Sequence, residues 1–281
     1  MTRKEIKAKF KRTVRKSKTE YKGELRAAKR EFKTASRTLR RTYKSGITAA
    51  KAEYKSDTLA YYTERGKRPP VDPPRRALLE EIGNSVTHGA GAIFAIVAFA
   101  LMLAHSTRPD QYVGAVMYFF GLFTMCTVSC LYHAFAHGSA VKRLFRRFDY
   151  SCIYLLIGAT FAPILLSYIG GTLGTVFFII QWLIIATGIS LVGVFGPGRL
   201  RFIHIPLYLA LGWVGLLLLP RMVEAGDIAF LWFILGGGII YSVGIIPFAM
   251  KTKVAHFIWH FFVLAGAVVQ WVGIYLQIYL G

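Results

Sequence analysis

Seven apolar runs occupy most of the last three-quarters of this chain, and they constrain its fold more than any other feature. They lie at approximately 83–105, 112–136, 148–168, 174–194, 202–219, 228–248 and 256–278. Each is close to the roughly 20 apolar residues that a transmembrane helix needs. Residues 77–281 contain 10 Lys or Arg and 6 Asp or Glu in 205 positions, which excludes a soluble enzyme of ordinary surface. The sequence therefore predicts an all-α bundle of seven transmembrane helices with short, Gly- and Pro-containing connections.

The basic residues predict the orientation of these helices. A cytoplasmic N-terminus places 33 basic residues inside and leaves only Arg108 and Arg221 outside. Cytoplasmic loops carry the excess of Lys and Arg in membrane proteins. We therefore expect a cytoplasmic N-terminus, a C-terminus outside and a location in the plasma membrane. No long apolar run precedes Pro69, so we expect no signal peptide.

The first quarter of the chain is basic instead of apolar. Residues 1–76 hold 25 basic and 8 acidic residues, so +17 of the net charge of +21 lies there. Apolar or small residues recur at steps of three and four that average near 3.7, at Ile6, Phe10, Val14, Ser17, Tyr21, Leu25, Ala28, Phe32, Ala35, Leu39, Tyr43, Ile47, Ala50 and Tyr54. This period forms a nearly straight stripe, unlike the 3.5 period of a left-handed coiled coil. We predict a long basic amphipathic helix.

Two partners suit this stripe about equally. The flanking Lys and Arg favour binding of residues 1–66 to anionic lipid headgroups, where each basic residue contributes about 1 kcal/mol. Alternatively, the helix pairs with a copy of itself in a homo-oligomer. Nucleic acid is not expected, because a basic face beside a membrane anchor is more simply explained by lipid contact. The predicted domains are a basic helical segment at 1–68, a Pro-rich linker at 69–79 and a membrane domain at 80–281.

Few ionisable side chains fall inside the predicted spans, and such residues are functional candidates because lipid solvates them poorly. They are His88, His133, Asp149, His204, His256 and His260. In the predicted topology, His133, Asp149, His256 and His260 all lie within one or two turns of the cytoplasmic boundary. Four residues at one depth predict one shared site.

The spacing of these residues indicates a metal site. His256 and His260 are four residues apart, as are Ser129 and His133, so each pair shares a helix face. Three imidazoles and one open position are the ligand set of a catalytic zinc site. Imidazole favours Zn²⁺ over calcium or magnesium, although copper, nickel and iron also accept it. The His256 helix lacks the glutamate of soluble zinc proteases, so Asp149 is the candidate general base.

Simpler interpretations exist for each member of this site. A single membrane histidine is most often a hydrogen-bonded packing residue, and Asp149 follows several arginines with which it can pair. Cys130 and Cys152 lie close in sequence to Ser129 and Asp149, and they rank behind the histidines as metal ligands. His88 and His204 are candidates for supporting the ligands.

Five separated motifs occur in one order along the apolar part of the chain, namely Glu80–Gly89, Ser129–His133, Asp149–Tyr154, Gly158–Pro163 and His256–His260. Together they resemble the hemolysin III branch of the progestin and adipoQ receptor (PAQR) family. The resemblance covers approximately residues 77–281. It does not extend to the long basic segment.

This resemblance implies seven spans, a cytoplasmic N-terminus and a zinc ion near the inner leaflet. The implied ligands are His133, His256 and His260. Ser129 and Asp149 are implied to lie beside the water molecule that completes the metal site. Related receptors and ceramidases imply hydrolysis of lipid amides, whereas the family name implies lysis of cells.

Three function classes follow from these observations. The first is a zinc-dependent hydrolase of lipid amides or esters, with Asp149 as proton acceptor. The second is a pore-forming, hemolytic protein, and the third is a lipid sensor whose zinc only joins helices. We favour a hydrolase or regulator of membrane lipids at the cytoplasmic leaflet. A lipid headgroup is then expected to meet Arg146, Arg147 or Lys253.

Overall fold

The computed structural model describes residues 1–65, 73–250, 252 and 254–281. In these ranges all regular structure is helical. The chain divides into two units, Met1–Pro70 and Val71–Gly281, and the second is called the membrane domain below. Of the predicted Pro-rich linker, residues 69–72 lie outside the described residues, and residues 73–77 are not helical.

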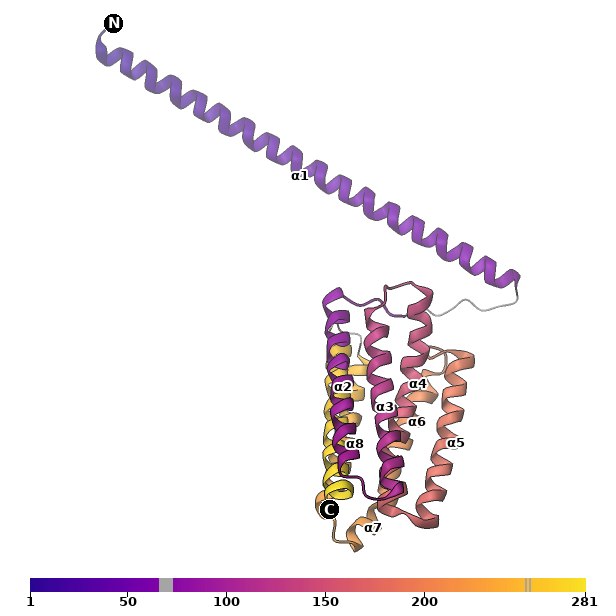
Figure 1. The fold of residues 1–281 in the computed structure, drawn as a ribbon. Helices are drawn as coiled ribbons and strands as arrows, with labels where there is room; N and C mark the ends of the chain where they lie inside the picture. The colour runs from indigo at the N-terminus through magenta and orange to yellow at the C-terminus, as the bar shows by residue number, and fades with distance from the viewer. Residues whose placement is uncertain (66–72, 251, 253) are drawn as a thin grey trace. The chain divides into compact units, whose positions relative to one another are not determined.

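The first unit contains one helix, α1 (Arg3–Glu64), of 62 residues. Figure 1 shows it as a single uninterrupted helix. Its N-terminus is capped by Glu5, whose Oε2 accepts a hydrogen bond from the Thr2 backbone N–H at 2.7 Å. None of its residues is buried. The predicted long amphipathic helix is therefore present, and within this unit its apolar stripe is exposed.

Among its described residues, the membrane domain contains seven helical segments that are long and apolar enough to cross a membrane. They are α2 (Leu78–Ala104), α3 (Pro109–Ala134), α4 (Ala140–Pro163) continued by η1 (Ile164–Ile169), α5 (Gly171–Phe195), α6 (Arg201–Gly212) continued by η2 (Trp213–Leu218) and α7 (Leu219–Glu224), α8 (Ile228–Ala249), and α9 (Ala255–Ile274) continued by η3 (Tyr275–Leu280). They form the bundle of Figure 1 and confirm the predicted seven-helix fold. The cytoplasmic position of the N-terminus stays a prediction.

Two helices begin well before the apolar runs from which they were predicted. Helix α2 starts at Leu78 and α4 at Ala140, whereas the apolar runs start near residues 83 and 148. Backbone hydrogen bonding continues through polar residues when their side chains find partners inside the bundle. At α4 the start is fixed by Ser139, whose Oγ accepts a hydrogen bond from the Lys142 N–H at 3.1 Å. These extra turns carry polar residues that the apolar runs exclude.

The order of packing brings the two ends of the membrane domain together. Helices α2, α3 and α4 pack as neighbours, α8 packs on α9, and α9 packs against α2. Small residues allow close approach between helices in a membrane. At Gly121 of α3, a Cβ atom would collide with Ala159 and with the Leu155 carbonyl of α4. The contact of α9 with α2 places the last helix of the membrane domain beside its first helix, although the two are far apart in sequence.

Candidate metal centre

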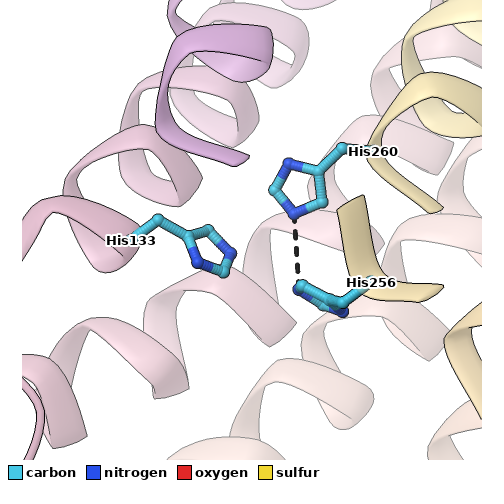
Figure 2. Close-up of side chains that lie close together, drawn as sticks. All are labelled: His133, His256 and His260. Atoms are coloured by element: carbon cyan, nitrogen blue, oxygen red, sulfur yellow. Dashed lines mark hydrogen bonds between the residues drawn. The ribbon is translucent and has the colours of Figure 1, made fainter. Parts of the chain in front are cut away.

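Three histidines from two helices face one another in the membrane domain. His133 lies in the last turn of α3, and His256 and His260 lie in the first two turns of α9. Their candidate ligand nitrogens all lie within 4.8 Å of one another. His133 and His260 are buried and His256 is half-buried. Figure 2 shows the three rings converging from α3 and α9. The structure therefore brings together the three predicted metal ligands.

A carboxylate holds the His133 ring from behind. His133 Nδ1 lies 2.5 Å from Glu81 Oε2. An ionised carboxylate only accepts hydrogen bonds, so Nδ1 carries the proton and Nε2 keeps its lone pair. Nε2 is buried and has no hydrogen-bond partner among the described residues. Histidines that bind metals are commonly oriented in this way, by a carboxylate on the nitrogen that does not bind the metal.

The two histidines of α9 are spaced as zinc ligands require. Their Nε2 atoms lie 3.3 Å apart, as the dashed line in Figure 2 marks. Two nitrogens at about 2.0–2.1 Å from a tetrahedral zinc ion are separated by about 3.3–3.4 Å. His260 Nδ1 is also buried and lacks a partner in the described part of the chain. The donor types, the spacing of the two Nε2 atoms of α9 and the unpaired Nε2 of His133 fit a bound metal ion.

A buried lysine neutralises the carboxylate that holds His133. The Lys142 side chain is 1% exposed. Its Nζ donates to Glu81 Oε1 at 3.0 Å and to the Phe135 carbonyl at 2.9 Å. A buried charge is tolerated when it is paired and hydrogen-bonded, and both conditions hold here. Glu81 therefore connects α2 to both α3 and α4 at the metal centre.

Two further polar residues of α2 complete this side of the site. The His88 ring stacks on the His260 ring, with ring centroids 3.8 Å apart and an interplanar angle of 21°. Both His88 nitrogens are buried and unpaired within the described ranges. Asn84 Nδ2 lies 3.3 Å from His133 Nδ1. The expectation that His88 supports the ligands agrees with this position, although the contact is a ring stack.

The two predicted catalytic residues lie beside the histidines. Ser129 is buried on α3 and Asp149 is buried on α4. The Asp149 carboxylate lies near the Ser129 side chain and is an electrostatic neighbour of His133. All five predicted site residues thus gather in one region, which α3, α4 and α9 build.

With this geometry established, comparison with known proteins identifies the family. Residues 76–271 match the family model described as "Haemolysin-III related". The chain belongs to this family. It is 34% identical to "Hemolysin-3" of Bacillus cereus over 192 residues, which are 67% of this chain and 87% of the relative. It is 30% identical to the "Hemolysin-3 homolog" of Bacillus subtilis (strain 168) over 192 residues, which are 67% of this chain and 89% of the relative.

A human protein is also similar to this haemolysin III chain. It is the "Monocyte to macrophage differentiation factor", which is 28% identical over 206 residues, or 71% of this chain and 85% of the relative. These matches confirm the resemblance inferred from the sequence motifs. Helix α1 lies outside the matched family region, which begins at residue 76.

Some predicted members of the haemolysin III site lie elsewhere. His204 Nδ1 lies 2.9 Å from the Tyr154 hydroxyl in a separate cluster on α6 and α4. Cys130 Sγ lies 3.3 Å from the Ser85 hydroxyl, and Cys152 is buried in the apolar core. Among the residues that the structure describes, the three histidines are the group that can hold a metal, and neither cysteine belongs to it.

An arginine that was not predicted lies near the metal centre. Arg76 precedes α2 and is an electrostatic neighbour of His133, His256 and Asp149. Its Nη1 is buried with no partner in the described part of the chain. Arg147 instead donates from Nη1 to the Gly193 carbonyl at 3.0 Å, near the end of α5. Lys253 lies outside the described residues.

An apolar pocket lies close to the histidines. Residues of α3, α4, α6, α8 and α9 line it, and most of them are aliphatic or aromatic. Phe248 and Trp259 belong to its wall, and the Phe248 ring centroid is 6.1 Å from that of His256. Such an apolar lining is typical of pockets that bind hydrocarbon groups. Gln270, the late polar residue of α9, also lines it.

Proposed function

We propose that this haemolysin III protein is a zinc-dependent hydrolase of lipid amides or esters in the plasma membrane. One observation carries the proposal: the three histidines converge, with His133 Nε2 unpaired among the described residues, beside a buried carboxylate and an apolar pocket. Zinc held by His133, His256 and His260 would polarise a carbonyl group and acidify a water molecule. The other ions that accept imidazole are outcomes of the metal analysis below.

The residues around the histidines have separate roles in this proposal. Asp149 accepts the proton of the attacking water, because it is the buried carboxylate next to the ligands that has no lysine bound to it. Ser129, which lies near Asp149, is proposed to orient its carboxylate. Glu81 keeps the Nε2 lone pair of His133 directed at the metal. These groups are positioned before substrate arrives, which is how active sites lower reorganisation costs.

The proposed substrate is a lipid with its acyl chain in the apolar pocket. Phe248, in the pocket wall, lies beside His256. In the proposal, a lipid whose acyl chain fills the pocket therefore has its carbonyl group at the metal centre. Arg76 pairs through Nε with Glu80 Oε1 at 3.6 Å, and its Nη1 is buried and unpaired within the described ranges. This Nη1 is the proposed partner of an anionic headgroup or of the product carboxylate. With a cytoplasmic N-terminus, the site faces the inner leaflet.

A regulatory role without turnover is the second candidate, and one observation favours it. The histidines come from α3 and α9, so a metal ion would join two helices that are distant in sequence. In that case metal would stabilise the bundle without supporting a reaction. The relatives named hemolysin suggest membrane permeabilisation as a third outcome, which dye release from vesicles measures.

Metal content tests the site first. We expect about one zinc ion per chain in the purified, detergent-solubilised protein, and none in the His256→Ala/His260→Ala variant. His204→Ala is the matched control, because His204 is a buried histidine outside the cluster. No metal in the wild type after zinc is supplied at neutral pH would overturn the proposal.

The Asp149→Asn variant then separates hydrolase from regulator. We expect it to retain zinc and to lose about 10²–10⁴-fold in hydrolysis of lipid amides or esters, measured by mass spectrometry of products. Wild-type protein that holds zinc but hydrolyses no lipid in such a screen would favour the regulatory role. Equal hydrolysis by wild type and Asp149→Asn would refute the role of this carboxylate.

A further inference from the structure

Helix α1 repeats every 11 residues. An aromatic residue followed by lysine recurs at this interval, at Phe10-Lys11, Tyr21-Lys22, Phe32-Lys33, Tyr43-Lys44 and Tyr54-Lys55. Eleven residues make three turns at about 3.67 residues per turn, so the five aromatic rings lie along one line of the helix. All five are between 65% and 77% exposed. Nothing in the haemolysin III match accounts for this line, because the match begins after α1.

Aliphatic residues widen the aromatic line into a stripe. Ile6 and Leu39 each lie four residues before an aromatic residue of the line, and Val14, Leu25 and Ile47 each lie four residues after one. Residues four apart share a helix face, so they lie on either side of the aromatic line. Every one of these side chains is exposed. Long helices gain most of their stability from packing of such a face, so α1 requires a partner surface.

The two edges of this stripe carry opposite charge. The basic edge consists of the residues three positions before and one position after each aromatic residue. They are Lys7, Lys11, Lys18, Lys22, Lys29, Lys33, Arg40, Lys44, Lys51 and Lys55. The acidic edge consists of the residues one position before and three positions after each position of the aromatic repeat. Six of the seven acidic residues of α1 belong to it: Glu20, Glu24, Glu31, Glu53, Asp57 and Glu64. The seventh, Glu5, lies on the same side of the helix.

We propose that α1 pairs with α1 of a second copy as a parallel, in-register coiled coil. In a parallel pair the left edge of one helix meets the right edge of the other, so basic edges meet acidic edges on both sides of the stripe. In an antiparallel pair like edges meet, and like charges repel. Two copies inserted in one membrane have the C-terminal ends of both α1 helices connected to it at the same face, which suits a parallel pair. An 11-residue repeat gives such a pair a right-handed supercoil.

An anionic leaflet fits the same helix less well. Helices that lie on anionic lipid have basic residues on the polar face around the apolar one. Here one edge instead presents acidic residues such as Glu20, Glu24 and Glu31 at the level of the headgroups, where they are repelled. Along Arg3–Glu64 the one intrahelical ion pair is Lys16–Glu20, at 3.9 Å. The rest of the acidic edge has no ion pair within the helix and is available to a second copy.

Disulfide trapping tests the pairing and its direction. Phe10→Cys and Tyr54→Cys place a thiol on the stripe near each end of α1, and the natural cysteines begin only at Cys126. In a parallel, in-register pair each new cysteine lies beside the same cysteine of the second chain, as a disulfide requires. In an antiparallel pair the two copies of residue 10 would be about 70 Å apart, at about 1.5 Å per residue.

The matched controls place cysteine on the opposite face of the same turns, as Ala8→Cys and Ser56→Cys. Full-length protein in neutral phosphatidylcholine vesicles is oxidised, and dimers are quantified by non-reducing gel electrophoresis. We expect disulfide dimers of both stripe variants to form about tenfold faster than those of the controls and the wild type. No excess dimer for the stripe variants, or loss of the dimer when phosphatidylglycerol is included, would overturn the proposal.

Two sets of charge changes with the same net effect distinguish the two partners. The set Glu20→Gln/Glu24→Gln/Glu31→Gln removes three negative charges from the acidic edge. The set Thr34→Lys/Ser45→Lys/Ser56→Lys adds three positive charges to the opposite face, so each set raises the net charge by three. Each set is combined with Tyr54→Cys and tested in neutral vesicles. We expect the first set to slow dimer trapping about tenfold and the second to leave it nearly unchanged. Equal effects of the two sets would refute edge pairing.

Discussion

Helix α1 and the membrane domain arrange the same kinds of side chain in opposite ways. In α1 apolar rings such as Phe32 are 77% exposed, and charges are ordered around them. In the membrane domain apolar side chains also face outward, but polar residues such as His260 are 1% exposed inside the bundle. The first arrangement suits the proposed pairing with a second helix, whereas the second is stable in lipid because polar groups bind one another.

The comparison shows where each region is sensitive. The polar interior of the membrane domain depends on a few mutually dependent contacts, such as Glu81 with His133 and Lys142. In the proposed pair, the stripe of α1 would depend on many similar contacts, each of small energy. A single substitution should therefore change the membrane domain strongly and α1 weakly.

The largest expected difference comes from removing the metal. A strong chelator should lower the thermal unfolding midpoint of the membrane domain, since a ligand bound only to the folded state stabilises it. The helicity of α1 should not change. Intrinsic tryptophan fluorescence measures the unfolding of the membrane domain, because all five tryptophans lie beyond residue 180. Circular dichroism measures the total helix content.

Protein without the metal ligands controls for this effect. His133→Ala should show the lower midpoint with or without chelator. If the chelator lowers the midpoint of both proteins equally, its effect does not come from this site.

Breaking the buried ion pair should have the next largest effect. Glu81→Gln leaves the Lys142 charge buried without a counter-ion, which costs about 3–5 kcal/mol of unfolding free energy. Because the amide no longer orients His133 as a carboxylate does, metal affinity should also fall about 10–100-fold. Thermal unfolding and metal titration measure the two effects separately.

The double variant Glu81→Gln/Lys142→Met resolves stability from metal binding. It removes both charges, so most of the stability should return while metal affinity stays low. Recovery of both properties would mean that Glu81 acts only as the counter-ion of Lys142 and does not orient His133.

The same glycine substitution should have opposite signs in the two regions. Gly121→Ala places a methyl group against Ala159 and the Leu155 carbonyl, and overpacking of this kind costs about 1–3 kcal/mol. At Gly23 of α1 no atom lies within 4 Å of an added Cβ, so Gly23→Ala should stabilise the helix by about 1 kcal/mol. Thermal unfolding followed by fluorescence and by circular dichroism measures each; equal signs would contradict the packing observed at Gly121.

The smallest effect should come from a gap in the stripe of α1. Ser36 occupies a stripe position, four residues after Phe32. Ser36→Leu should strengthen pairing of α1 by about 1 kcal/mol through added apolar contact, and leave the midpoint of the membrane domain unchanged. Disulfide trapping through Tyr54→Cys measures pairing. Ser45→Leu, on the opposite face, is the control and should have no effect; an equal gain there would indicate nonspecific association.

Much of the site could be predicted from depth along the chain. Once seven spans were recognised, His133, Asp149, His256 and His260 had to lie at one level of the bundle, and the structure brings the three histidines together. His204 shows the limit of this argument. It begins a span at a comparable depth, yet it contacts Tyr154 in another part of the bundle. Depth follows from sequence position, whereas the direction in which a helix face points depends on its neighbours.

The supporting residues escaped prediction for a related reason. Glu81 and Lys142 lie before the apolar runs of their helices, so hydropathy assigns them to the aqueous boundary. Glu81, Asn84 and His88 are spaced by three and four residues, and this spacing was the signal of a shared polar face on α2. The partner of that face lies 52 residues away at His133, and only packing could identify it.

The sequence by itself determined the number of membrane helices, the period and charged edges of α1, and the residue types of the metal centre. These properties are local, because they depend on apolar length, helical periodicity and ligand chemistry. The tertiary structure decided which polar residues meet: it places α9 against α2 and thereby joins His260 to His88, while α2 brings Glu81 to His133 and Lys142. Such contacts arise only when helices distant in sequence pack together, since each buried polar group must find its partner on another helix.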